Sequence, residues 1–166
     1  MVVLHSGAGG LAPAIAERCD RLAGLIFIDA VLPHPGRSWA DTAPPGLADR
    51  LRGLAEDGML PTWDRWFPAD AIARLLPDAP TREAFLRDLP PTPLAWLDAP
   101  SPRSAEWEAI PAAFVQLSDA YADEAAEADR LGWTVRRFPL HHLAMLSDPA
   151  KVAALLMDVS LSLLTK

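Results

Sequence analysis

The N-terminal stretch "MVVLHSGAGGLAPAIAE", residues 1–17, governs the interpretation of the whole chain. Residues 2–4 form a short apolar run, and residues 5–7 have the composition of a tight turn. Apolar side chains then recur at helical spacing, at Leu11, Ile15, Cys19 and Leu22. The pattern predicts a strand, a sharp turn and a helix in direct succession.

Ser6 stands at the centre of that turn. A nucleophilic serine on a sharp strand-to-helix turn needs small neighbours, because the backbone is strained and the helix passes close to the strand, and the usual pattern is G-x-S-x-G. Here residues 4–8 read "LHSGA", with leucine and alanine in the two glycine positions and Gly9 and Gly10 following. We interpret Ser6 as a degenerate nucleophile elbow. The alternative is a glycine-rich helix start that only makes a tight turn or binds a phosphate.

Three further segments have the composition of strands. The apolar run "LAGLIFIDAVLP" (22–33) is closed by Pro33 and is typical of a strand buried on both faces of a parallel sheet. The segments "AAFVQLSDAY" (112–121) and "WTVRRFPL" (133–140) predict two more strands, joined by a helix over 123–131. Residues 148–164 predict a final amphipathic helix with Asp148 as its cap and Pro149 at its first position.

A long insertion, roughly residues 35–110, separates the second predicted strand from the third. It far exceeds the usual connection of about 2–6 residues, and an insertion of this length is usually a lid. Helical segments are expected at 46–58, 70–78 and 81–89, and five of the six tryptophans lie within the insertion. These rings either hold small helices together or line an apolar substrate pocket. For the second role the candidates are Trp63, Trp66 and Phe67.

Composition excludes several classes of function. The chain has 166 residues, enough for one compact domain, and a net charge of −7. Its arginines are scattered, so we expect no nucleic acid partner and no binding to anionic lipid. The single cysteine, Cys19, cannot form an internal disulfide, and the four histidines lack metal-site spacing, so we expect a reduced, metal-free protein. With no long apolar run and no signal-peptide pattern, the expected location is the cytoplasm, with no membrane contact.

The segments "VVLHSGAGGLAPAIA", "LIFIDAVLP", "AFVQLSDAYADEAAEADRLGWTVRRF" and "HHLAMLSDP" resemble the nucleophile, post-nucleophile and histidine regions of α/β-hydrolase-fold proteins. The resemblance is closest to small esterase-like hydrolases that carry a helical lid. It implies that Ser6 is the nucleophile and that His142, after the last strand, is the general base, with His141 as the neighbouring alternative. It implies no cofactor.

The resemblance places the catalytic acid after the strand that precedes the base, which implies Asp119. Asp119 would orient the imidazole and stabilise the imidazolium formed during acyl transfer. Asp123 is close enough in sequence to compete, and Asp29 is a third candidate because related folds supply the acid from the end of that strand. Asp119 can also be interpreted as a helix N-cap or turn residue.

The same resemblance implies that the backbone N–H of Gly7 is one donor of the oxyanion hole. The second donor comes from a loop that precedes the nucleophile strand in the family, and the sequence has no residues for that loop. The resemblance therefore covers only the part from the elbow to the C-terminus. We expect an unpaired apolar edge at residues 2–4, which natural proteins rarely leave exposed. A homo-oligomer or a second chain that completes the sheet is the expected partner.

These observations predict an incomplete α/β-hydrolase-like parallel sheet of about four strands, with flanking helices and an inserted helical lid. The parts are the elbow and following strand (1–34), the lid (35–110) and the C-terminal strands and helices (111–166), one domain in all. The expected function is a serine hydrolase acting on an ester or thioester of a hydrophobic small molecule, with His5 and the lid aromatics in contact with substrate. Two alternatives remain: a non-hydrolytic homologue that binds or cyclises an apolar natural-product intermediate, and a non-catalytic binding module.

Overall fold

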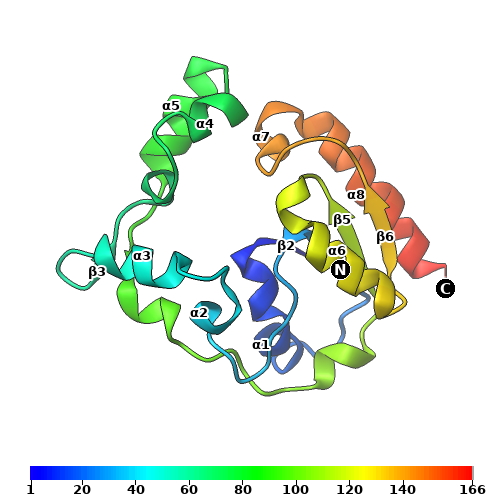
Figure 1. Ribbon diagram of the computed structural model, residues 1–166. Helices are drawn as coiled ribbons and strands as arrows, with labels where there is room; N and C mark the ends of the chain where they lie inside the picture. Colours follow the sequence, from blue (N-terminus) through cyan, green and yellow to red (C-terminus); the bar gives the residue numbers. More distant parts are fainter. Residues whose placement is uncertain (166) are drawn as a thin grey trace. The chain divides into compact units, whose positions relative to one another are not determined.

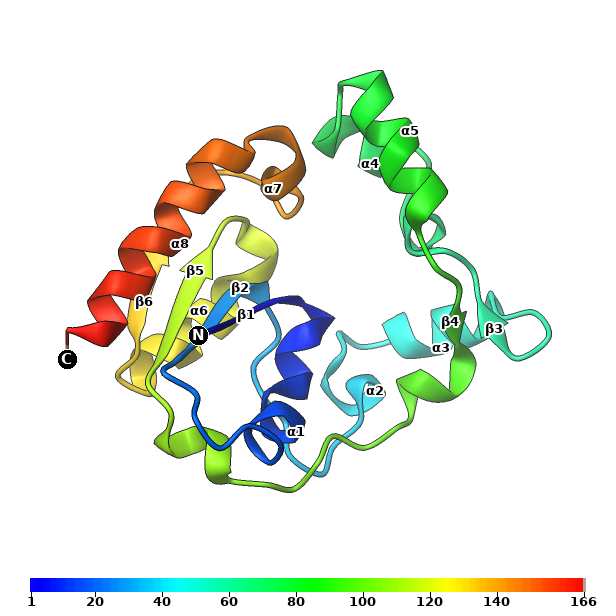
Figure 2. The same ribbon diagram turned by 180° about the vertical axis from the view of Figure 1, so that it is seen from behind.

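The computed structural model describes residues 1–165, which divide into two compact units. One unit contains residues 1–36 and continues from Ser101 onward, and the other is Arg37–Pro100. The first unit holds a parallel sheet in the order β1-β2-β5-β6, the four strands drawn in Figures 1 and 2. Their bounds are Val2–Ser6, Leu25–Ala30, Ala112–Gln116 and Thr134–Arg137. The predicted parallel sheet is confirmed.

Strand β2 is the centre of the first unit because every one of its residues is buried. Phe27 packs on one face of the sheet with Phe114, and Ile28 packs on the other face with Val115. Helices α1 (Ala12–Ala16) and α6 (Ala122–Arg130) contribute residues to the first face. Helices α7 (Ala144–Ser147) and α8 (Pro149–Leu164) contribute to the second, and α8 runs alongside β5 and β6 in Figure 2. Helices on both faces explain why β2 has no polar face.

The predicted helix after Ser6 is shorter than its apolar spacing indicates. Residues Gly7–Leu11 form a 3-10 turn (η1), α1 ends at Ala16, and Cys19 is exposed beyond the helix. The reason is local, because the turn passes directly against the chain leaving β2. A Cβ atom added to Gly9 would lie 1.8 Å from the carbonyl oxygen of Val31. Gly9 therefore serves close backbone approach, and the glycines of this turn also weaken regular α-helix.

The C-terminal elements follow the sequence pattern with small differences. Helix α6 lies within one residue of its predicted position, whereas β6 begins one residue later and ends three residues earlier than predicted. Asp148 is the N-cap residue of α8 and Pro149 opens the helix, as predicted, although the Asp148 side chain makes no capping hydrogen bond. Asp148 has φ −140° and ψ 58°, outside the extended conformation usual for a capping residue. Two short 3-10 turns, η4 (Glu106–Ala109) and η5 (Asp119–Tyr121), flank β5.

The chain leaves the first unit and returns to it at neighbouring points. The amide N–H of Gly36 donates to the carbonyl oxygen of Ser101 over 2.9 Å. The Ser101 hydroxyl donates to the carbonyl oxygen of Gly10 over 3.0 Å. Gly36 and Ser101, at which the two segments of the first unit end and begin, therefore lie next to each other.

The second unit is built from short helices and a two-stranded antiparallel sheet. Its core consists of Leu51, Leu60, Trp66 and Leu97, with further tryptophan rings packed around them. The elements are α2 (Trp39–Thr42), α3 (Leu47–Gly53), β3 (Met59–Leu60), η2 (Trp63–Trp66), α4 (Ala71–Leu75), α5 (Ala79–Asp88), β4 (Thr92–Pro93) and η3 (Leu94–Leu97). This unit lies inside the segment predicted as a lid, and the lid role stays a prediction.

Helix α3 ends well before the predicted limit at residue 58. Asp57 and Gly58 have φ angles of 49° and 75°. Both lie in the left-handed region, which excludes them from an α-helix, although α3 already ends at Gly53. The chain turns there into β3, so the apolar spacing of residues 46–58 indicated more helix than forms.

Strand β1 stands at one edge of the sheet in the described part of the chain, and its residue Val3 is 45% exposed. The partner expected along this edge stays a prediction. Across residues 1–165, no helix combines the length and the apolar character needed to span a bilayer.

Replacing Gly9 by alanine is expected to destabilise the first unit by about 3 kcal/mol or more, because the new methyl group would overlap the Val31 carbonyl and one strand end would have to move. Chemical denaturation followed by circular dichroism measures the effect. Gly53→Ala is the control, since an added Cβ there meets nothing within 4 Å. Equal stability of the two variants would contradict the close approach.

Candidate active site

Ser6 ends β1 in a strained backbone conformation, with φ 56° and ψ −132°. A non-glycine residue in such a region costs of order 1–3 kcal/mol and persists only where the surroundings enforce it. Within residues 1–165, the non-glycine residues with positive φ are Ser6, Asp29 and Asp57. Ser6 and Asp29 lie at the carboxyl ends of the adjacent strands β1 and β2, so the backbone strain is concentrated at that end of the sheet.

Asp29 is the extra residue of a bulge between β1 and β2. His5 pairs with Ile28 and Ser6 pairs with Ala30, so the register skips Asp29. The pairing resumes at once, because the Val31 amide donates to the Ser6 carbonyl oxygen over 3.1 Å. A bulge redirects the side chain of the unpaired residue. At this bulge the backbone of Asp29 has a φ of 40°.

The Asp29 carboxylate is completely buried and accepts four hydrogen bonds. Oδ1 accepts from the Leu117 amide (2.6 Å) and the Ser118 amide (3.0 Å). Oδ2 accepts from the Ser118 hydroxyl (2.6 Å) and lies 3.3 Å from Nδ1 of His142. Burial alone would raise the pKa of Asp29, but the hydrogen bonds from His142, Ser118 and Leu117 outweigh it and lower the pKa. Asp29 is therefore an ionised acceptor at neutral pH.

The His142 ring lies between two other rings. The centroid of the His5 ring is 4.4 Å away at an interplanar angle of 31°, and the Tyr121 ring is stacked at 5.1 Å and 12°. The His142 side chain is only 12% exposed. With Nδ1 held by Asp29, the imidazole is fixed in position and in tautomer, since the carboxylate selects Nδ1–H.

His5 braces the segment that carries His142. Its Nε2–H donates to the His142 carbonyl oxygen over 3.0 Å. Burial is the main cause that lowers the pKa of His5 to about 4, and the neighbouring His142 lowers it further. His5 is therefore neutral at physiological pH.

Tyr121 contacts both Ser6 and His142. Its hydroxyl lies 3.3 Å from Ser6 Oγ, while its ring stacks on His142. We did not predict this residue from the sequence. The available signal was its uniqueness, because it is the single tyrosine of the chain and stands shortly after β5.

The structure separates the three candidate acids. Asp29 contacts His142, whereas Asp119 is exposed in η5 and Asp123 is exposed on α6. The residue expected to orient His142 was Asp119, and the side chain found there is Asp29. The physical reason is the bulge, which turns Asp29 inward, while Asp119 begins a solvent-facing turn.

The structure also distinguishes the two candidate bases. The His141 ring accepts from the Leu143 amide at Nδ1 (3.3 Å), and its Nε2 lies 2.9 Å from the Ser147 hydroxyl. Both nitrogens of His141 are thus used within its own segment. The His142 ring instead faces the residues at the ends of β1 and β2. Gly7 directly follows Ser6 and opens η1, so its expected oxyanion role stays a prediction.

The aromatic candidates for substrate contact lie in the second unit. Trp66 is buried, and its indole N–H donates to the Pro61 carbonyl oxygen over 2.9 Å, so it serves the core of that unit. Trp63 packs edge-on against Phe67 and Phe85. Substrate contact by these residues and by His5 stays a prediction.

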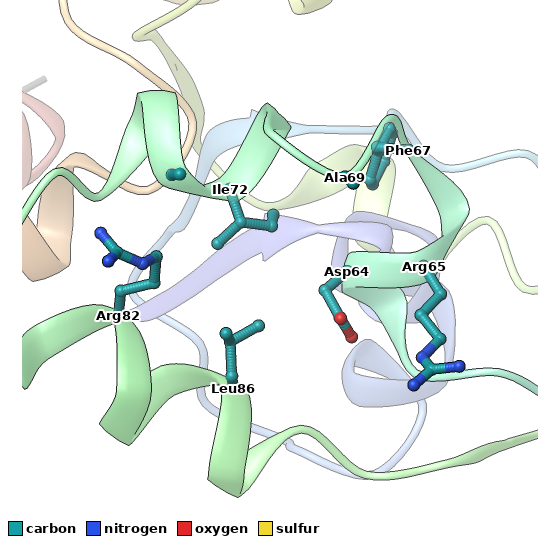
Figure 3. Close-up of a pocket in the computed structure, with 8 residues that line it drawn as sticks. Asp64, Arg65, Phe67, Ala69, Ile72, Arg82 and Leu86 are labelled. Carbon is teal, nitrogen blue, oxygen red and sulfur yellow. The ribbon is translucent and has the colours of Figure 1, made fainter. Parts of the chain in front are cut away.

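The second unit contains a cavity of about 470 Å³. Figure 3 shows Ile72 of α4 and Leu86 of α5 pointing toward one another across it, with Arg82 beside them. Phe67, 38% exposed, forms part of the lining. The cavity combines apolar walls with a few charged groups, as small-molecule sites commonly do. Across residues 1–165, no three side chains of His, Cys, Asp or Glu gather as metal ligands would.

We compared the chain with known proteins and with solved structures. No protein-family model matches the sequence, and no curated protein matches it. Several solved structures do. An extracellular α/β-hydrolase from a Paenibacillus species, described as homologous to tobacco salicylic acid binding protein 2, is similar with a TM-score of 0.74 and 19% identity over 95% of this chain and 70% of that chain.

Two further structures agree. A pyrethroid hydrolase from Sphingobium faniae JZ-2 has a TM-score of 0.62 and 21% identity, over 95% of this chain and 69% of that one. A variant of tomato methylketone synthase I, complexed with β-ketoheptanoate, has a TM-score of 0.66 and 12% identity. The match covers 97% of this chain and 70% of that chain. The chain therefore has part of the α/β-hydrolase fold, as the sequence predicted, and it spans about 70% of the length of these structures.

Stability should fall as the pH is lowered from about 6.5 to 4, in part because of His5. The unfolded chain binds a proton at His5 near pH 6.5, whereas the folded chain resists protonation until about pH 4. His5→Gln removes this contribution, so its loss of unfolding free energy over the interval is expected to be smaller. Urea denaturation of the wild type and His5→Gln at several pH values gives the unfolding free energy of each. The contributions of the other titrating groups are common to both proteins and cancel in the difference between them. Parallel curves would show that His5 is not buried as described.

Proposed function

We propose that this protein is a serine hydrolase in which Ser6, His142 and Asp29 form the catalytic triad. The proposal depends most on one observation, the contact between His142 Nδ1 and a buried, ionised carboxylate beside the strained serine turn. A triad is recognised by geometry and roles rather than by position in the chain. The order here is Ser, Asp, His, as in other proteins of this fold.

In the proposed reaction Ser6 Oγ attacks the carbonyl carbon of the substrate while His142 takes the serine proton. Asp29 keeps the imidazole in the required tautomer and stabilises the imidazolium that forms. The N–H of Gly7 donates to the oxygen of the tetrahedral intermediate. The acyl group remains on Ser6 until water, activated by His142, releases it.

For the substrate we propose an ester or thioester of a hydrophobic small molecule. The second unit supports this choice, because it is rich in tryptophan and contains a cavity with apolar walls. Apolar and aromatic side chains offer contact area, and a few polar groups fix orientation. One protein of similar fold is named a pyrethroid hydrolase, which is compatible with an apolar substrate.

Covalent labelling by a fluorophosphonate probe is the direct test of the nucleophile. Intact mass spectrometry should show one adduct on the wild type and none on Ser6→Ala. His142→Ala should label far more slowly, because the serine loses its base. A folded wild type that takes no label would instead favour a non-hydrolytic protein that binds or cyclises an apolar intermediate, or a binding module. Ligand binding that survives Ser6→Ala would support that second candidate, and one protein of similar fold is named a synthase.

The choice of acid has its own test. Asp29→Asn should lower the labelling rate by about 10³- to 10⁴-fold, because an amide can accept from the backbone donors but presents the wrong partner to Nδ1–H. Asp119→Asn is the matched control at the exposed candidate and should label at the wild-type rate. The reverse result would return the acid role to Asp119.

A further inference from the structure

Tyr121 has no role in the triad, yet it contacts two of its members. Its hydroxyl lies 3.3 Å from Ser6 Oγ, and its ring stacks on the His142 imidazole at 5.1 Å. The residue is half-buried and also packs against the core cluster around Phe27. One side chain thus bridges the proposed nucleophile and the proposed base.

The position of Tyr121 is fixed by the same carboxylate that holds His142. Tyr121 ends η5, and the residue preceding η5 is Ser118. Both the amide and the hydroxyl of Ser118 donate to Asp29. Asp29 therefore anchors the turn that carries Tyr121 as well as the imidazole on which its ring stacks.

The direction of the hydrogen bond follows from the chemistry of the two hydroxyls. Burial raises the pKa of Tyr121, so its hydroxyl keeps its proton at neutral pH. Ser6 must deliver its own proton to the base in order to attack. Both conditions are met when the Tyr121 O–H donates and Ser6 Oγ accepts.

A donor at this atom acts most strongly when the oxygen leaves. In the acyl-enzyme, Oγ is an ester oxygen and a weak acceptor. During deacylation water attacks the acyl carbon and passes a proton to His142. The C–Oγ bond then breaks, Oγ retains the electron pair, and His142 returns the proton to it. A hydrogen bond to an oxygen that gains negative charge is stronger than one to a neutral oxygen, so it lowers the barrier to this step.

We propose, on the basis of the serine hydrolase function above, that Tyr121 is a further catalytic residue that donates a hydrogen bond to Ser6 Oγ as this oxygen leaves in deacylation. Tyr121 keeps its proton throughout, so the proton balance of the step involves only water, His142 and Ser6. Its ring is a positioning element for His142.

Tyr121→Phe tests the hydroxyl and leaves the stacked ring in place. With p-nitrophenyl butyrate as the probe ester, kcat is expected to fall about 10- to 100-fold, the range for a hydrogen bond to a charged group. The value of kcat/KM, which reports acylation, should change by less than threefold, so KM falls together with kcat. Intact mass should show the butyryl adduct accumulating on Ser6 during turnover. Ala120→Ser, at an exposed position of the same turn, is the control and should behave as wild type.

Equal losses in kcat and kcat/KM would overturn the proposal, because a merely structural role slows both steps alike. Unchanged values of both would overturn it as well. If the wild type neither hydrolyses the ester nor forms a butyryl adduct, and so behaves like Ser6→Ala, the serine hydrolase function fails and this inference falls with it. If the wild type is acylated at Ser6 and Tyr121→Phe behaves like the wild type, only the proposed role of Tyr121 fails.

Discussion

The bulged pairing of β1 with β2 is the constraint on which the rest of the site depends. At this point Ser6 and Asp29 both adopt positive φ on neighbouring strands, and the ladder closes again through the Val31 amide. Neither residue would hold that conformation alone. The buried strand β2 and the close passage of Gly9 over Val31 supply the rigidity that keeps it. The backbone strain thereby presents a hydroxyl and a carboxylate from one short stretch of sheet.

Much of the fold could be predicted from the sequence because its signals are local. A run such as residues 25–30 has no polar face, and only a strand covered on both sides uses such a run. The prolines and the length of the insertion marked its limits with similar clarity. The extents of the helices were less predictable, since apolar spacing continues past the points at which the helices end. Asp57 and Gly58 illustrate this, because nothing in the apolar spacing signals their conformation.

The sequence singled out some of the residues that the structure brings together beside Asp29 and missed others, for a related reason. Ser6 and His142 carry sequence context, one in a small-residue turn and the other after the last strand. The contact between Asp29 and His142 depends on a one-residue register skip, which no periodicity in the chain reveals. Asp119 had the more usual position in sequence, but an exposed turn keeps it away from the imidazole. Tyr121 is a third kind of case, in which the role comes from two long-range contacts and from no motif.

The hydrogen bond between Gly36 and Ser101 has an evolutionary consequence. It brings together the two points at which the inserted unit joins the sheet-bearing unit, so the insertion begins and ends at almost one place. All of the residues of the proposed chemistry lie outside the insertion. Lineages could therefore exchange, lengthen or rebuild residues 37–100 as a cassette without disturbing the residues of the proposed chemistry.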